Sequence, residues 1–404
     1  MSQTPLNLSK SVKSESSLDR GVLVLTFDQL NTAFLGPYGN TWLPTPGWNE
    51  LAASSLLLEQ CFTPHTTLRE AFVRLWSENT PSPTLANQLS TLQVQTTLWS
   101  DDTTVLSLGS ETGFSSLQPL PSPSCVQAAE ELEQTVLYKQ IQSILDQLTS
   151  SNLSGLNWIH LKAITGPWDA PLPLRAALFD EEIGEPPDWI LPPPVTTTTP
   201  LESDDLLRWQ VSYGAQIQVI DFCLQYTLGW LESLPAHQRP LVIVSSPRGC
   251  NVGTHGVCLN SDAIWTENVQ IPLLIYDGDR TRCLRSQGLA SWVEIGPTLI
   301  AYFGNHEPTS EYSLLRRIDA PGLPGIDRCL LNSGTETGLR TTSWFLRLPS
   351  KSQPQLFIKP DDRNDVSEIS QRLGDVTEQL LKVTQELQES EGSVTQQIPD
   401  PPVD

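Results

Sequence analysis

The chain has 404 residues, which is enough for roughly two or three average domains or for one large α/β domain with an appendage. Its 24 Lys and Arg residues stand against 46 Asp and Glu residues, for a net charge of −22. This shortage of bases argues against binding to nucleic acids or to anionic membranes, because both partners are held by cationic side chains. An apolar content of 38% with 12 Trp excludes a wholly disordered chain.

The first segment, residues 1–20, is polar and rich in serine, which predicts a mobile tail. It has no apolar segment of the secretory type, and no part of the chain approaches the roughly 20 apolar residues that a membrane-spanning helix requires. The seven cysteines have no C-x-x-C spacing, which fits reduced thiols. We therefore expect a cytoplasmic protein.

Short apolar segments rich in β-branched residues come next. They lie at residues 21–26, 156–161, 241–245 and 272–276. Continuous apolar segments of this kind are typical of strands that are buried on both faces of a parallel sheet. Helical periodicity over residues 128–148 and 206–234 separates some of them. The alternation predicts an α/β fold in which helices sandwich a mostly parallel sheet.

This α/β core is expected over residues 21–295. Within the core, residues 185–203 are rich in Pro and Thr, so they cannot form a helix or a central strand and predict a surface excursion.

Near the end of the chain, apolar residues from Val366 to Leu387 recur alternately every three and four positions. This spacing predicts a C-terminal amphipathic heptad helix over residues 364–390, followed by a polar tail over 391–404. The apolar stripe has two interpretations: it packs on its own domain, or it supports self-association through residues 366–387.

Six sequence motifs, in order, resemble those of the sulfatase family of the alkaline phosphatase superfamily. They are LVLTFDQLNTAFLGPYGNTWLPTPGWNELAA at 23–53, WIHLKAITGPWDAP at 158–171, LVIVSSPRGCNVGTHG at 241–256, VEIGPTL at 293–299, LRTTSW at 339–344 and LFIKPDDRNDV at 356–366. The resemblance implies the alkaline phosphatase/sulfatase-like fold, in which residues 296–363 form the C-terminal part, with a small C-terminal subdomain. It also implies a divalent metal and a nucleophile aimed at sulfur or phosphorus. A fold does not by itself imply an activity, so these expectations depend on which residues occupy the metal and nucleophile positions.

The metal ligands that this family uses are mostly missing. Where the family has two adjacent carboxylates after the first strand, this chain has Phe27 and Asp28, and the second metal-binding pair corresponds to Pro247 and Arg248. Neither proline nor a guanidinium can coordinate a cation. We expect Asp28 to be a vestigial ligand and no metal or other cofactor to bind, unless neighbouring carboxylates rebuild the site; the candidates are Asp101, Asp102, Glu267 and Asp277.

The nucleophile motif C/S-x-P-S-R corresponds to FTPHT, which puts Phe62 at the nucleophile position, where a phenyl ring is inert. Cys61 lies one place too early for formylglycine formation, and Thr63 has no evident activating base. The family's substrate-binding His falls near Thr165. His255 in GTHG matches a family His near the site, as a vestigial catalytic residue or as a turn residue.

These losses predict a sulfatase-like pseudoenzyme that binds an unknown ligand or protein partner, without nucleic acid or membrane. Its pocket is expected at the carboxyl ends of the strands. It would contain Asp28, Phe62, Thr165, Arg248 and His255, with Trp168 beside it. The alternative is a divergent sulfate or phosphate ester hydrolase that uses Cys61 or Thr63 and a Ca or Mg ion. A third hypothesis is an assembly protein that acts through the heptad helix.

Overall fold

The computed structural model describes residues 21–399 apart from 78–82, 123–124, 126, 151–152, 180–183, 192, 194, 196–200, 260–262, 279–282, 305–312 and 390–397. The predicted tail at 1–20, most of the tail at 391–404 and part of the Pro/Thr-rich excursion therefore lie outside the described residues. No helix in the described part of the chain is long and apolar enough to span a membrane.

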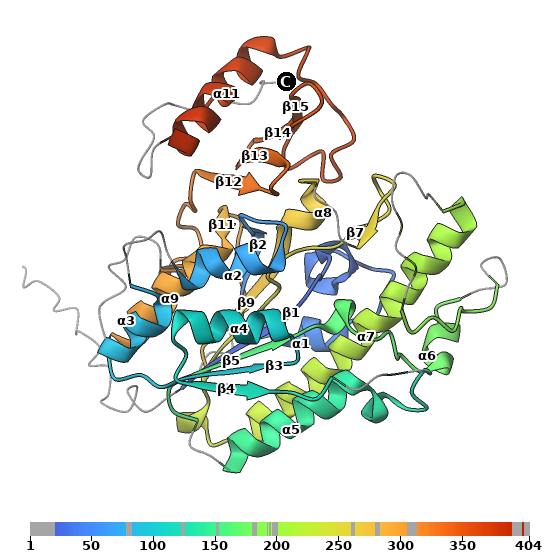
Figure 1. Cartoon of the computed structure of the whole chain (residues 1–404), viewed down its shortest axis with the longest axis vertical. Helices are drawn as coiled ribbons and strands as arrows, with labels where there is room; N and C mark the ends of the chain where they lie inside the picture. The colour runs from blue at the N-terminus through green and yellow to red at the C-terminus, as the bar shows by residue number, and fades with distance from the viewer. Residues whose placement is uncertain are drawn as a thin grey trace, which may run out of the picture.

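A nine-stranded sheet forms the centre of the fold (Figure 1), in the order β10-β2-β9-β6-β1-β5-β3-β4, with β11 also paired to β2. Its strands are β1 (Val22–Phe27), β2 (Leu56–Phe62), β3 (Thr96–Ser100), β4 (Ser116–Pro119), β5 (Leu156–Leu161), β6 (Leu241–Ser245), β9 (Gln270–Tyr276), β10 (Leu284–Ser286) and β11 (Ala290–Ser291). Within the described part of this sheet, β9 alone runs antiparallel to its neighbours. The prediction of a mostly parallel sheet is confirmed, but the apolar segment at 272–276 did not reveal its reversed direction, because burial on both faces is compatible with either.

The central strand β1 explains why helices cover both faces of the sheet. Alternate side chains of a strand point to opposite faces, so Val22 and Val24 enter one apolar core while Leu23 and Leu25 enter the other. The Leu23 face is covered by α1 (Pro46–Ala53), α5 (Val136–Ser150), α6 (Leu172–Ala176) and α7 (Ser203–Ser233). The Val22 face is covered by α2 (Leu68–Trp76), α3 (Leu85–Thr91), α4 (Thr103–Thr112), α9 (Ile295–Phe303) and α10 (Arg316–Asp319).

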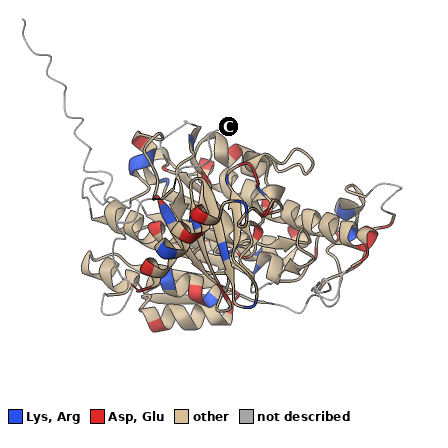
Figure 2. Cartoon of the chain, turned by 90° about the horizontal axis from the view of Figure 1, so that it is seen from above, with Lys and Arg blue, Asp and Glu red and all other residues tan. Residues whose placement is uncertain are grey.

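Short elements connect these layers. They are η2 (Thr32–Phe34), η3 (Gly36–Tyr38), η4 (Leu132–Gln134), η5 (Ala163–Thr165), η6 (Ala236–Gln238), η7 (Trp292–Glu294), α8 (Thr266–Val269) and the strand pair β7 (Asn251–Val252) and β8 (Cys258–Leu259). The described part of the Pro/Thr-rich excursion is fixed to the core by the buried Arg175, which donates hydrogen bonds to the carbonyls of Pro187 and Trp189. Lys and Arg residues are few over the whole ribbon (Figure 2).

The C-terminal subdomain is an antiparallel sheet with one helix packed on it (Figure 1). The elements are β12 (Arg328–Asn332), β13 (Glu336–Thr341), β14 (Trp344–Pro349), β15 (Gln355–Ile358) and α11 (Gly374–Glu389). The apolar stripe of α11 packs on its own sheet, where Leu380 and Val383 are fully buried beside Trp344. Self-association through residues 366–387 stays a prediction. Because these apolar side chains are buried against the sheet, little apolar surface is left to contact a second chain.

The C-terminal helix begins ten residues later than the heptad pattern predicts. The Asp362 carboxylate accepts hydrogen bonds from the backbone N–H groups of Val366 and Ser367, which holds this segment in a turn. The side chain of Val366 is 71% exposed and so does not join the stripe. Such local side-chain-to-backbone bonds compete with helix formation.

The packing of α11 gives a first test. Leu380→Ala should lower the free energy of unfolding by about 2–5 kcal/mol, because it empties a buried site between the helix and the sheet. The matched control is Glu378→Ala on the exposed side of the same helix, expected within about 0.5 kcal/mol of wild type. Urea denaturation measures both, and equal stabilities of the two variants would contradict this packing.

Candidate functional site

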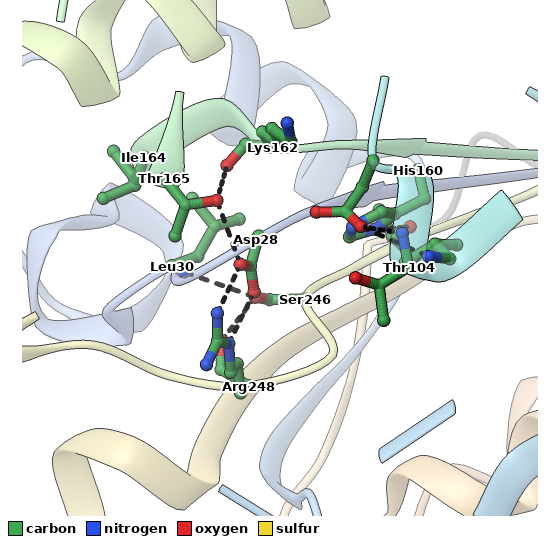
Figure 3. A network of polar contacts seen from close by, with 12 residues as sticks. Asp28, Leu30, Thr104, His160, Lys162, Ile164, Thr165, Ser246 and Arg248 are labelled. Carbon is green, nitrogen blue, oxygen red and sulfur yellow. Dashed lines mark hydrogen bonds and ion pairs between the residues drawn. The ribbon is translucent and has the colours of Figure 1, made fainter. Parts of the chain in front are cut away.

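A buried ion pair lies at the carboxyl ends of the central strands (Figure 3). Asp28 follows β1, and Arg248 follows the neighbouring strand β6. The Arg248 guanidinium donates in a bidentate manner: Nε lies 2.9 Å from Asp28 Oδ1, and Nη2 lies 2.7 Å from Oδ2. The side chains are 1% exposed for Asp28 and 13% for Arg248, so both charges are largely removed from water. This two-point geometry is the strong form of a charge-assisted hydrogen bond.

The third member of this cluster is Thr165 in η5, after β5. Its hydroxyl lies 3.2 Å from Asp28 Oδ2 and 3.0 Å from the carbonyl of Lys162 (Figure 3). Two residues beside these partners have a positive φ: Gln29, directly after Asp28, with 63°, and Ala163, two residues before Thr165, with 47°. Non-glycine residues rarely adopt this left-handed region, and such backbone strain concentrates at functional sites.

The loops around the pair support each other. The Ser246 hydroxyl donates to the carbonyl of Arg248 at 2.6 Å and accepts from the N–H of Leu30 at 3.2 Å. From α7, the Tyr213 hydroxyl donates to the carbonyl of Gln29 at 3.0 Å and accepts from the N–H of Asn31 at 2.9 Å. The positions of the two charged side chains are therefore fixed by several elements of the fold.

The protonation states of the pair follow from two opposing effects. Burial by itself would raise the pKa of Asp28, but the charge and hydrogen bonds of Arg248 outweigh it, and the pKa lies below the ordinary value of 3.8. For Arg248, burial lowers the pKa and Asp28 raises it, with a net rise. Both shifts favour the charged pair.

The residues at this position do not fit a divalent cation. Calcium and magnesium need six or more oxygen ligands, whereas both oxygens of Asp28 already accept from Arg248. A guanidinium here repels a metal ion instead of binding it. Within the described ranges, no group of three or more His, Cys, Asp or Glu side chains could hold a metal ion.

The carboxylates considered as replacement ligands have other roles. Asp101 accepts from the N–H of Lys162 at 2.9 Å and from Gln140 Nε2 at 3.2 Å. Asp102 caps the N-terminus of α4 through the N–H groups of Thr104 and Val105.

The other two candidate ligands, Glu267 and Asp277, also have no described contact with Asp28. Glu267 accepts from the N–H of Val252 and from the hydroxyl of Thr254. Asp277 follows β9. Because β9 is antiparallel to β6, Asp277 lies at the end of the sheet where β6 begins, whereas Asp28 lies at the end where β1 and β6 finish.

The candidate nucleophiles are buried. Phe62 ends β2 and is 1% exposed, packed beneath the Arg340 guanidinium with 5.0 Å from its central carbon to the ring centre. Burial raises the pKa of the Cys61 thiol well above its ordinary value, so the reactive thiolate is disfavoured. The hydroxyl of the fully buried Thr63 donates to the carbonyl of His65 at 3.2 Å.

Trp168 and His255 make their described contacts with residues other than Asp28 and Arg248. Trp168 is buried, and its indole N–H donates to the carbonyl of Ile164 at 2.9 Å, so its ring presents no exposed face to a ligand. His255 stacks on Trp265 with 3.6 Å between ring centres. The Arg347 guanidinium carbon lies 3.3 Å from the centre of the same Trp265 ring and must occupy its other face. Of the predicted site residues, the structure thus brings together Asp28, Thr165 and Arg248.

A cavity of about 420 Å³ lies between the main sheet and the C-terminal subdomain, next to Phe62. Its walls come from the loop at residues 31–39, from β2, from the start of α8 and from the segment after β15. Four basic side chains line it: Arg285, Arg340, Lys359 and Arg363. The sequence motifs LRTTSW and LFIKPDDRNDV contain three of them, but a motif gives no sign that they share a cavity.

Comparisons with known proteins agree on the fold. No protein-family model matches the sequence, and no curated protein matches it. The phosphonate monoester hydrolase of Agrobacterium radiobacter superposes with a TM-score of 0.72 and 14% identity over 92% of this chain and 95% of that one. The chain has the sulfatase fold.

Two further structures support this assignment. A protein solved with its substrate D-glucosamine-2-N,6-O-disulfate gives a TM-score of 0.71 and 13% identity over 92% of this chain and 98% of its own. A sulfatase-like protein of Bacteroides thetaiotaomicron gives 0.70 and 13% over 92% and 91%. Identities this low establish the shared fold and leave the activity of this sulfatase-fold chain to its own residues.

The ion pair gives a second test. Arg248→Ala should lower the free energy of unfolding by about 3–5 kcal/mol, because it leaves the buried Asp28 carboxylate without its counter-charge. The matched control is Arg69→Ala, which removes an exposed arginine paired with Glu111 at 3.1 Å and should cost about 0–1 kcal/mol. Denaturant unfolding at neutral pH measures both, and equal losses would rule out a special role for the buried pair.

The pH dependence gives a third test. Because the pKa of folded Asp28 lies below 3.8, its contribution to stability is present above pH 3.8 and is lost as the pH falls through the lower, folded pKa. The stability difference between wild type and Asp28→Asn should therefore shrink in acid. Denaturant unfolding curves between about pH 2 and pH 7, which is roughly the range over which carboxyl groups titrate, measure this stability difference. A difference that grows in acid would contradict the pKa assignment.

Proposed function

We propose that this sulfatase-fold chain is a non-catalytic protein that binds a ligand or a protein partner. The observation that carries the proposal is the bidentate Asp28–Arg248 pair, which uses both oxygens of the remaining carboxylate. An arginine in this position supplies a permanent positive charge without a metal, so the fold keeps its electrostatic balance but loses the Lewis acid that ester hydrolysis in this fold would use.

The burial of the nucleophile candidates supports the same conclusion. Phe62 has no nucleophilic atom, and neither Cys61 nor Thr63 reaches solvent. The Thr63 hydroxyl is directed to a backbone carbonyl rather than to a base. The alternative, a divergent sulfate or phosphate ester hydrolase, would need one of these side chains to become exposed and deprotonated.

A cytoplasmic location is part of the proposal. All seven cysteines are free thiols, five of them buried, as is usual where thiols stay reduced.

Metal content and turnover together test the proposed function. After dialysis against trace calcium, magnesium, manganese and zinc, we expect mass spectrometry to detect no stoichiometric metal in the wild-type protein. We also expect no hydrolysis of 4-nitrophenyl sulfate or 4-nitrophenyl phosphate above that of a Cys61→Ala/Thr63→Ala variant. Retained metal together with turnover that this double variant loses would establish the hydrolase alternative, and turnover that survives in it would reveal another nucleophile.

A further inference from the structure

The cavity beside Phe62 concentrates positive charge in an acidic protein. Four of its 19 lining residues are Lys or Arg, although these make up only 24 of the 404 residues of the chain. Two lining residues are acidic, and both already have partners: Glu59 pairs with Arg285 at 3.2 Å, and Glu267 accepts from Val252 and Thr254. The local excess of cations therefore opposes the net charge of the whole molecule.

Arg340 is the least compensated of these cations. It is 3% exposed and donates only to neutral acceptors, namely the carbonyls of Thr341 and Trp344 and, at 2.9 Å, Gln60 Oε1. Its Nε has no hydrogen-bond acceptor among the described residues. Burial lowers the pKa of Arg340 to about 10, which expresses the cost of holding this charge away from water.

Other buried cations show what Arg340 lacks. Arg248 and Arg347 each contact a carboxylate within 3 Å, and Lys359 contacts Asp365 at 2.5 Å. The buried Arg175 has no carboxylate contact among the described ion pairs, but its three guanidinium nitrogens all donate to backbone carbonyls. Arg340 has neither arrangement in the part of the chain that the structure describes. The charge of Asp365 acts on it without a direct contact, so a ligand anion would supply the contacting counter-charge that Arg340 lacks.

Arg363 lies at the side of the same cavity and is exposed. A Cβ atom at Gly39, which also lines the cavity, would lie 3.9 Å from its Nη1, so the guanidinium lies beside the loop at residues 31–39. Its side chain has no hydrogen bond or ion pair with any residue in the described ranges. It is thus available to a ligand that enters from solvent.

We propose that this cavity binds a small organic anion whose carboxylate, sulfate or phosphate group is held by Arg340 and Arg363. A volume of about 420 Å³ is within the range of small-molecule sites, and Gln60, Gln270 and Asn364 offer neutral hydrogen-bonding groups to the rest of the ligand. This inference rests on the proposed function, since a non-catalytic site retains its ligand unchanged.

Anion titrations of the intact chain test it. Sodium sulfate, phosphate and acetate are titrated separately at constant ionic strength set with sodium chloride, and the shift in thermal unfolding gives an apparent Kd for each. We expect saturable stabilisation by at least one of them, which also identifies the anionic group. Loss of one charged contact in Arg363→Ala should weaken this binding about tenfold, and Arg340→Lys should weaken it too, because it removes Nε and the planar fork.

The matched control is Arg372→Ala, which removes an exposed arginine of the same subdomain away from the cavity and should leave the Kd unchanged. No saturable effect of any anion beyond that of chloride would overturn the inference. So would unchanged binding in Arg363→Ala, which alters an exposed side chain and should fold normally.

The two proposals fail separately. Absence of anion binding without ester hydrolysis would overturn the anion site alone. Ester hydrolysis that the bound anion inhibits would overturn the non-catalytic function and leave the site in place.

Discussion

The contact between Asp28 and Arg248 joins the two strands at the middle of the sheet. A lone carboxylate at this depth would be too costly to keep ionised, and a lone guanidinium would be equally unfavourable. Each residue therefore supplies the counter-charge that the other needs. The loops after β1, β5 and β6 are arranged around the pair. The arrangement is self-contained, since no external ion is required for neutrality.

Under the proposed function, this self-sufficiency distinguishes the chain from a hydrolase that depends on a metal ion. In such an enzyme the bound cation balances the charge of the carboxylates that hold it. Here the positive charge is covalently part of the chain and occupies the space at the strand ends permanently. The ring of Phe62 at the end of β2 is buried as well, and it offers no nucleophilic atom.

The sequence predicted the sheet and its helix layers because their signals are local: apolar segments for strands, periodicity for helices. The C-terminal subdomain was expected only because its motifs resemble those of the sulfatase family. The sequence also predicted that Arg248 would lie where a metal would otherwise be, but not that its guanidinium would close onto Asp28 rather than onto a ligand. The reversed direction of β9 and the late start of α11 were missed because they depend on pairing partners and on single side-chain contacts such as those of Asp362. The cationic cavity was missed for a similar reason: Arg285, Arg340 and Arg363 come together only when the C-terminal sheet packs beside β2.

The position of β1 at the centre of the sheet has a consequence for biosynthesis. Val22 pairs with Leu156 on one side and with Leu241 on the other, so more than half of the chain must leave the ribosome before both neighbours of β1 exist. Until then, a mostly apolar strand has unpaired backbone groups on at least one edge. Strand pairing between such distant segments is slow, and the partly folded chain is prone to aggregation in the meantime. The same topology that encloses the ion pair in the finished protein therefore makes the nascent chain dependent on protection from aggregation.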